Sequence, residues 1–232
     1  MANWFLGRAL AEEAEAENAA WSFLGEGVTF WVTVAMLLVV GVAVYLVTRK
    51  KSNKKSFWTA KTMAVGAMCM ALSSVLSLIK LWPMPMGGSV TPASLLPLLL
   101  FAYCSGVGPG MVLGALYGVM QFLLDGMAWA ALGAIPNLLD YPIAFGLLGP
   151  AGCFRGSKAK MTAGFVLGCF GRFMASFLSG FLFYGQYAPE GVNPVWYSLT
   201  YNGSYMLVEC IICIALGLLV GERLAKELKK VA

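Results

Sequence analysis

The sequence predicts an all-α polytopic membrane protein, with a six-helix bundle preceded by one extra N-terminal transmembrane helix. Three observations predict this fold class. Hydrophobic residues make up 59% of the 232 residues, charged residues only 12%, and histidine is absent, which is far outside the usual composition of soluble domains. Apolar stretches of about 17 to 25 residues, long enough to span a bilayer, recur along the chain. Basic residues gather at the ends of these stretches instead of forming a nucleic-acid-binding stripe.

The first apolar stretch, 29–48, follows an acidic segment instead of the basic segment that begins a signal peptide. We therefore expect it to be retained as a transmembrane helix. The lysine-rich polar segment 49–56 then links it to the remaining helices. This divides the chain into residues 1–56, with an acidic extracellular N-terminus, the extra helix and a basic cytoplasmic linker, and residues 57–232, the six-helix membrane domain.

Six further apolar stretches supply the helices of the second domain. They run over about 59–79, 92–107, 109–124, 135–154, 161–184 and 196–221. The stretches 92–107 and 109–124 are short and are separated only by a turn at 105–109, where Pro109 suits the first turn of the next helix. Two stripes of small residues repeat at helical spacing: Gly106, Gly110, Gly114 and Gly118, and Gly171, Ala175 and Ser179. Such stripes let helices approach closely, and we interpret them as internal packing surfaces.

Lysine and arginine residues follow three of the seven predicted spans and indicate the orientation of the chain by the positive-inside rule. They are Arg49, Lys50, Lys51, Lys54, Lys55, Lys61, Arg155, Lys158, Lys160, Arg223, Lys226, Lys229 and Lys230. Seven spans place all of them on one side of the membrane and most acidic residues on the other. We therefore predict a multi-pass protein of the cell membrane, with its N-terminus outside and its C-terminus in the cytoplasm.

Three ionisable residues, Asp140, Arg172 and Glu209, fall within predicted spans, where each costs about 2.5–3.5 kcal/mol at the membrane centre. Arg172 and Glu209 lie about halfway along neighbouring antiparallel helices. Either they pair with each other, or Arg172 contacts an anionic part of a ligand. Asp140 lies in the first turns of its helix, where its charge suits the helix dipole.

Polar and aromatic residues near Asp140 favour a functional interpretation of that carboxylate. Two stripes lie on the outer halves of the last two spans: Ser176, Gly180 and Tyr184, and Ser198, Asn202, Tyr205 and Glu209. A carboxylate, an amide and aromatic faces in one half of the bundle predict a pocket that opens to the outside. Such a pocket suits a small cationic heteroaromatic ligand.

Three ordered blocks of sequence resemble the thiamine-specific substrate-binding subunit, or S component, of energy-coupling factor (ECF) vitamin transporters. The blocks are Met84 to Thr91, Leu138 to Phe145, and Tyr187 to Gly191 followed by Tyr197 to Tyr205. The resemblance extends over about residues 59–221. It implies a six-helix fold that captures thiamine with high affinity outside the cell. It also implies a transmembrane coupling subunit and a pair of cytoplasmic ATPases as partners.

By position, the resemblance implies a ligand-binding role for seven residues: Asp140, Tyr141, Ser176, Gly180, Tyr184, Tyr197 and Asn202. Asp140, Tyr197 and the amide of Asn202 suit the ring nitrogens and amino group of the aminopyrimidine. The aromatic face of Tyr184 suits the thiazolium cation. Ser176 stands where the family often has a histidine, so the ring stacking expected there is lost.

Two further features follow from the resemblance. Ala67 and Ala71, one helical turn apart, match an alanine pair that the family presents to the coupling subunit. The alternative for this pair is packing inside the bundle. Trp82, in the first outer loop, is a candidate for an aromatic lid over the ligand.

Other functions fit the sequence less well. An S component for another vitamin or a thiamine precursor is the alternative within transport. An integral-membrane enzyme would need clustered catalytic groups, and the chain has no histidine and few intramembrane carboxylates. It also lacks the GxxxxGK[ST] motif, so energy must come from partner subunits. We expect a non-catalytic transport subunit without cofactor, metal or nucleic acid.

Overall fold

The computed structural model describes residues 59–85, 87–126, 133–154, 156–189 and 191–231. The predicted segment 1–56, with the extra helix at 29–48, lies outside these residues. The helices of the described part are α2 (Ala60–Leu78), α3 (Leu96–Ser105), α4 (Val107–Gln121), α5 (Ala134–Leu138), α6 (Ala144–Gly146), α7 (Lys158–Phe183), α8 (Pro194–Leu216) and α9 (Glu222–Val231). The prediction of a helical protein is therefore confirmed, with a small hairpin of β1 (Trp82–Pro83) and β2 (Ser89–Val90) added in the first loop.

Four helical segments of the described part are long and apolar enough to cross a membrane. They are Ala60–Leu78, Val107–Asp125, Lys158–Phe183 and Pro194–Leu228. Hydrogen-bonding caps explain where three of them begin: the side chains of Thr59, Ser157 and Asn193 each accept from a backbone N–H in the first turn. These four segments confirm four of the predicted spans, those at 59–79, 109–124, 161–184 and 196–221.

The prediction of a spanning helix over 92–107 is wrong. Helix α3 has only 10 residues, so at 1.5 Å per residue it covers about 15 Å of a hydrocarbon core about 30 Å thick. Leu99 is 0% and Phe101 1% exposed. A helix that is apolar on all sides is equally consistent with a lipid-facing span and a buried core helix, and here α3 is the core around which the other helices pack.

The prediction of one continuous helix over 135–154 is also wrong. This stretch divides into α5, a π-helix (Leu139–Ile143), α6 and a 3-10 helix (Gly149–Cys153). Pro142 lies inside the π-helix, and proline has no N–H to donate to the preceding turn. The interruption therefore has a local cause in the sequence, and it falls beside Asp140 and Tyr141. We call residues 134–153 the broken segment.

The glycine stripe of α4 packs inside the molecule, as predicted. A Cβ atom on Gly110 would lie 2.5 Å from the Cβ of Ala102 in α3. A Cβ on Gly114 or Gly118 would collide with the backbone carbonyls of Phe145 and Tyr141, respectively. Glycine at these positions therefore lets α4 lie directly against the backbone of the broken segment.

We expect Gly114→Ala to lower the free energy of unfolding by about 1–3 kcal/mol. The new methyl group would collide with the backbone carbonyl of Phe145, which cannot move aside as a flexible side chain can. Gly203→Ala in α8 is the matched control, since its Cβ would meet only Phe173 at 3.9 Å. That change should be neutral or should stabilise the helix by up to about 1 kcal/mol. Thermal unfolding of both variants in mild detergent tests this. Equal effects would contradict the close packing of α4.

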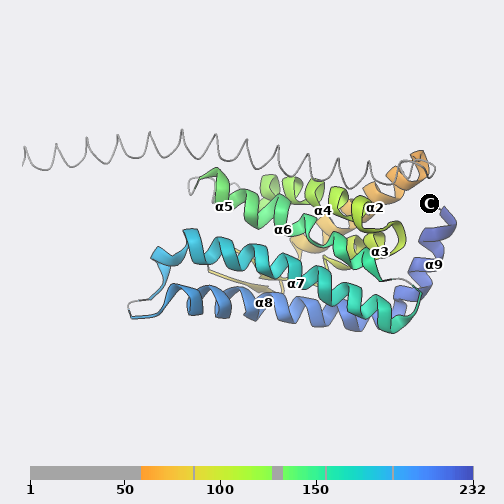
Figure 1. Cartoon of the computed structure of the whole chain (residues 1–232). Coiled ribbons are helices and arrows are strands. Elements are labelled where there is room, and N and C mark those ends of the chain that lie inside the picture. Colours follow the sequence, from red (N-terminus) through yellow and green to blue (C-terminus); the bar gives the residue numbers. More distant parts are fainter. Residues whose placement is uncertain (1–58, 86, 127–132, 155, 190, 232) are drawn as a thin grey trace, which may run out of the picture.

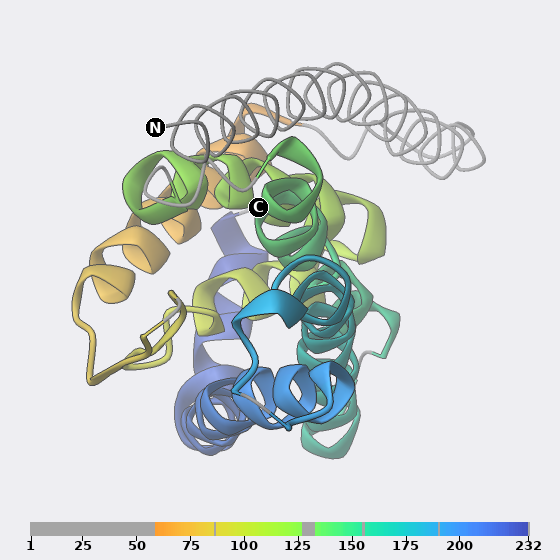
Figure 2. The ribbon, with the colours of Figure 1, turned by 90° about the vertical axis from the view of Figure 1, so that its left-hand side faces the viewer.

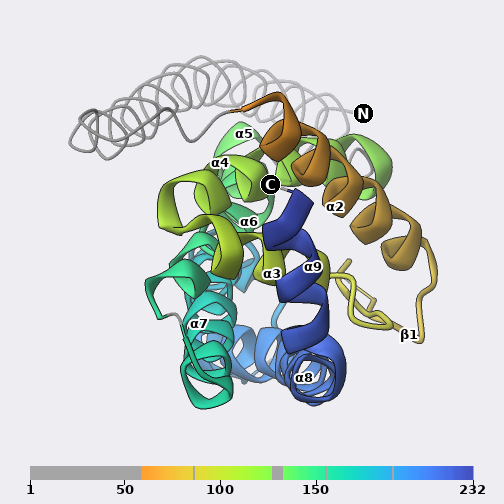
Figure 3. The same ribbon diagram turned by 90° about the vertical axis from the view of Figure 1, so that its right-hand side faces the viewer.

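Several basic residues gather at one end of the helical bundle. The starts of α2 and α7 and the whole of α9 lie at one end, and the connection between α7 and α8 lies at the other (Figure 1). Helix α9 crosses the first end in front of α3 (Figure 3). We call this end of the bundle the basic end, because it carries Lys61, Lys158, Lys160, Arg223 and Lys226. The β-hairpin lies between α2 and α8 (Figures 2 and 3).

Candidate functional site

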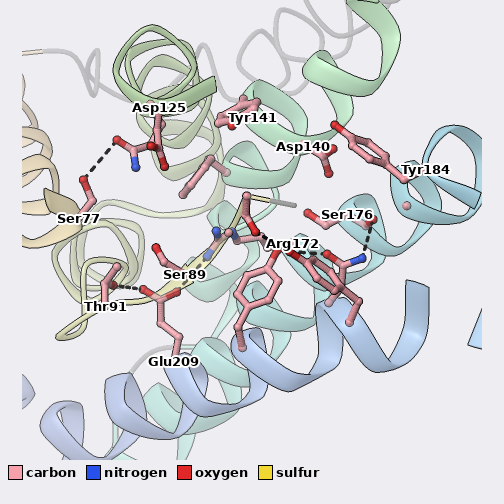
Figure 4. Close-up of a pocket in the computed structure, with 18 of the residues that line it drawn as sticks. Ser77, Ser89, Thr91, Asp125, Asp140, Tyr141, Arg172, Ser176, Tyr184 and Glu209 are labelled. Carbon is pink, nitrogen blue, oxygen red and sulfur yellow. Dashed lines mark hydrogen bonds and ion pairs between the residues drawn. The ribbon is translucent and has the colours of Figure 1, made fainter. Parts of the chain in front are cut away.

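A pocket lies in the half of the bundle away from the basic end. Its lining includes the last turn of α2, the end of α4, the second half of α7 and the first half of α8. The structure places in this lining all seven residues to which the sequence assigns ligand binding: Asp140, Tyr141, Ser176, Gly180, Tyr184, Tyr197 and Asn202. Figure 4 shows Asp140, Tyr184 and Ser176 on one side of Arg172, and Asp125 and Ser77 on the other.

Asp140 reaches the pocket from the π-helix of the broken segment. Its Oδ2 atom accepts a hydrogen bond from Ser179 Oγ at 2.7 Å. The next residue, Tyr141, presents its carbonyl to Gly118 of α4, and its ring packs edge-on against Phe122 at 5.5 Å between centroids. The packing of α4 and α7 against this segment therefore sets the position of Asp140.

Tyrosine rings form a second part of the lining. The rings of Tyr197, Tyr201 and Tyr205 follow one another along α8, with centroids 5.8 and 6.1 Å apart. Tyr184 follows the last residue of α7, and its ring lies 6.4 Å from that of Tyr187. The hydroxyl of Tyr201 donates to the carbonyl of Gly87 at 2.8 Å. The last contact fastens the hairpin turn to α8 at the edge of the pocket.

The amide of Asn202 ties α7 and α8 together at the pocket wall. Its Nδ2 lies 3.3 Å from the carbonyl of Ser176 and 3.1 Å from that of Ser198. Its Oδ1 accepts from the hydroxyl of Tyr205 at 3.1 Å. A Cβ on Gly180 would lie 2.9 Å from Nδ2, so glycine at this position makes room for the amide. Asn202 thus has a structural role beside the predicted contact with a ligand.

Arg172 and Glu209 pair with each other, as one of the two sequence interpretations predicted. Arg172 Nη1 lies 3.5 Å from Glu209 Oε2, and the guanidinium lies 4.4 Å from the centroid of the Phe145 ring. Glu209 is 1% exposed, and its Oε1 accepts from Thr91 at 2.5 Å and Ser94 at 2.8 Å. The pair also lines the pocket, so it forms a wall whose charges are largely neutralised within the protein.

The pocket contains three carboxylates, and their partners differ. Asp125 pairs with Lys80 at 2.7 Å and Glu209 pairs with Arg172. Among the described residues Asp140 has no cationic side chain at ion-pair distance, and a serine hydroxyl is its nearest bonded partner. A partly buried anion without a counter-ion is costly, so Asp140 marks the place in the pocket where a positive charge is favoured. The same described residues contain no cluster of His, Cys, Asp and Glu suited to a metal ion.

Several lining residues were not assigned to the pocket from the sequence. Ser77 of α2 donates to Gln121 of α4 at 3.3 Å, and Asp125 lies one turn further along. Serines spaced along an otherwise apolar helix were the available signal for this wall. Trp82, the candidate lid residue, lies in β1 with 69% of its surface exposed and is outside the lining.

Ala67 and Ala71 lie outside the pocket lining, on an exposed face of α2. Larger apolar side chains surround them on that face, including Met68 at 58% and Leu72 at 52% exposed. This placement contradicts the alternative that the alanine pair packs inside the bundle. The small side chains form a shallow strip on the outer surface of α2.

Comparisons with known proteins agree with one another. The model of the thiamine transporter protein family matches residues 63–228. The chain is 38% identical to thiamine transporter ThiT of Bacillus subtilis over 144 residues, covering 56% of this chain and 73% of that protein. It is 30% identical to ThiT of Lacticaseibacillus paracasei over 180 residues, covering 71% of this chain and 86% of the relative. A solved structure of ThiT from Listeria monocytogenes matches the fold with a TM-score of 0.64 at 21% identity, covering 72% of this chain and 96% of that chain.

Proposed function

Because the chain belongs to the thiamine transporter protein family and is thus a non-catalytic S component for thiamine transport, we propose that the pocket around Asp140 holds the vitamin. The protein is a multi-pass membrane protein of this family. In our proposal it binds thiamine with high affinity from the outside and delivers it without altering it. The ligand-binding residues are the seven that the sequence singled out.

The observation that carries this proposal is that, among the described residues, Asp140 has no cationic side chain at ion-pair distance. Thiamine combines an aminopyrimidine with a thiazolium ring that bears a delocalised positive charge. The other two pocket carboxylates already face Lys80 and Arg172, so a cationic ligand gains most from the carboxylate of Asp140. The hydroxyl of Tyr197 and the oxygen of Asn202 provide neutral hydrogen-bonding groups for the pyrimidine.

Tyr184 supplies an aromatic face on the same side of the pocket as Asp140 (Figure 4). A cation held against such a face gains about 2 kcal/mol when water is excluded. We therefore expect Tyr184→Phe to change thiamine affinity little and Tyr184→Ala to reduce it by more than about tenfold. Calorimetric titration of both variants decides the mechanism. If phenylalanine binds as poorly as alanine, the hydroxyl is the working group and the stacking assignment is wrong.

The orientation and partners form the second part of the proposal. The basic end faces the cytoplasm, which is supported by the gathering of Lys61, Lys158, Lys160, Arg223 and Lys226 at one end of the bundle. The pocket then opens toward the outside. A transmembrane coupling subunit docks on the strip formed by Ala67 and Ala71, and a pair of cytoplasmic ATPases supplies energy. In this proposal residues 57–232 form the substrate-binding domain.

Direct detection of the ligand tests the proposed function. The full chain is purified in mild detergent, and the small molecules it retains are identified by mass spectrometry. Calorimetry with added thiamine then measures the affinity, and a second mass spectrum shows whether thiamine remains chemically unchanged. We expect bound and unaltered thiamine. Retention of a different vitamin together with no measurable binding of thiamine would overturn the proposal.

A further inference from the structure

The small-residue stripe on α7 ends in a residue that packing alone does not explain. Along this stripe, a Cβ on Gly168 or Gly171 would lie 2.9 Å from the carbonyl oxygens of Leu148 and Leu147. The stripe therefore faces the backbone of the broken segment. Ser179 lies two helical turns further along the same face, beyond Ala175, and it is 0% exposed. Alanine would fit this spacing equally well, because only small size is required for close approach.

The hydroxyl of Ser179 has a specific partner. It donates to Asp140 Oδ2 at 2.7 Å and lies 3.5 Å from the carbonyl oxygen of Pro136. A buried hydroxyl is costly unless it is hydrogen-bonded, and a bond to a charged acceptor is stronger than one between neutral groups. The Asp140 contact therefore accounts for serine at a fully enclosed position.

Ser179 also lies beside the pocket and outside its lining. The face of α7 that lines the pocket carries Arg172, Ser176 and Gly180, and Tyr184 follows at the end of the helix. Ser179 is adjacent to Gly180 in sequence, yet it faces the broken segment behind Asp140. It thus contacts the carboxylate from outside the set of residues that line the pocket.

We propose that Ser179 is a positioning residue that fixes the plane of the Asp140 carboxylate, so that its second oxygen meets a cationic ligand in the pocket. The proposal rests on the thiamine-binding function proposed above. One oxygen of a planar carboxylate cannot be held without orienting the other. Because Asp140 belongs to a π-helix interrupted by Pro142, the neighbouring backbone is irregular, and a contact from the straight helix α7 provides the fixed reference.

Calorimetric titration with thiamine of the full chain tests this inference. Ser179→Ala should weaken binding by about five- to tenfold, the value of one hydrogen bond. Ser73→Ala is the matched control: Ser73 is also 0% exposed, its Oγ has no hydrogen-bond partner among the described residues, and it lies outside the pocket lining. That control should leave the affinity within about twofold. Ser179→Ala should also have no further effect in an Asp140→Ala background, whereas a purely structural role predicts that the two losses add.

Infrared spectroscopy of the thiamine-free protein provides a readout independent of the ligand. The difference spectrum between the original chain and Asp140→Asn identifies the carboxyl bands of Asp140. These bands should shift in Ser179→Ala and stay in place in Ser73→Ala. Unmoved bands, or equal losses of affinity in the two serine variants, would overturn the positioning role. Shifted bands in a protein that binds no thiamine would instead refute the proposed ligand and leave the contact established.

Discussion

Asp140→Asn is expected to reduce thiamine affinity by more than tenfold, because among the described residues Asp140 is the pocket carboxylate with no cationic side chain at ion-pair distance. A hydrogen bond to a charged group is worth about 1.5–3 kcal/mol, and about 1.4 kcal/mol corresponds to a tenfold change in affinity. The substitution keeps the size of the side chain and an oxygen that can accept from Ser179. Folding should therefore be nearly unaffected, and calorimetric titration should show the loss directly.

Two substitutions in the same pocket serve as controls for Asp140→Asn. Asp125→Asn makes the same chemical change at a carboxylate that pairs with Lys80 and is exposed to solvent, so affinity should change little. Glu209→Gln breaks the buried pair with Arg172, which should cost about 3–5 kcal/mol of folding stability. Losses of affinity at Asp125 as large as those at Asp140 would contradict the assignment of Asp140 as the ligand carboxylate.

Ala67→Leu combined with Ala71→Leu is expected to abolish thiamine uptake while leaving binding by the isolated subunit intact. Both residues lie on the exposed face of α2, away from the pocket. In lipid the hydrophobic drive for association is weak, so helices associate through close packing at small residues. Leucine at both positions would hold a partner helix away. Co-purification with the coupling subunit and uptake by cells measure the loss.

The control for bulk on the outer surface is Ala215→Leu, at an exposed position on α8. This change should leave binding, co-purification and uptake as they are. For the variant that combines Ala67→Leu and Ala71→Leu, thiamine binding and co-purification must be measured on the same preparation. If thiamine binding is lost as well, the strip supports the bundle itself and does not act as a docking surface.

Interactions between residues close in sequence could be predicted, whereas those between distant residues could not, except where charges in apolar helices need partners. Thr59, Ser157 and Asn193 cap helices through residues two or three positions away, and such starts can be recognised locally. The pairing of Arg172 with Glu209 was predictable because two charges in apolar helices need partners. The hydrogen bond from Thr91 to Glu209 joins residues 118 positions apart. The sequence around either residue does not predict this contact.

The broken segment and α3 could not be predicted from apolar length alone. Apolar length predicts that a segment is buried, in lipid or in protein, and it does not tell which of the two surrounds it. Pro142 was visible in the sequence, but proline inside a membrane helix is often accommodated without a break. Ser179 appeared as one member of a small-residue stripe. The role of the Ser179 hydroxyl becomes visible only when the structure places it beside Asp140.

Helix α2 carries both the proposed docking strip, Ala67 and Ala71, and part of the pocket wall. Ser77, in its last turn, bonds to Gln121 of α4 at 3.3 Å, and Ala67 and Ala71 face outward along the same continuous helix. If docking tilts α2 away from α4, the Ser77–Gln121 contact opens and the complex holds thiamine less tightly than the free subunit does. Thermodynamic linkage then requires that bound thiamine lower the affinity for the coupling subunit by the same factor. At equilibrium, vitamin-free subunits would in this way be associated with the coupling subunit more often than vitamin-loaded ones.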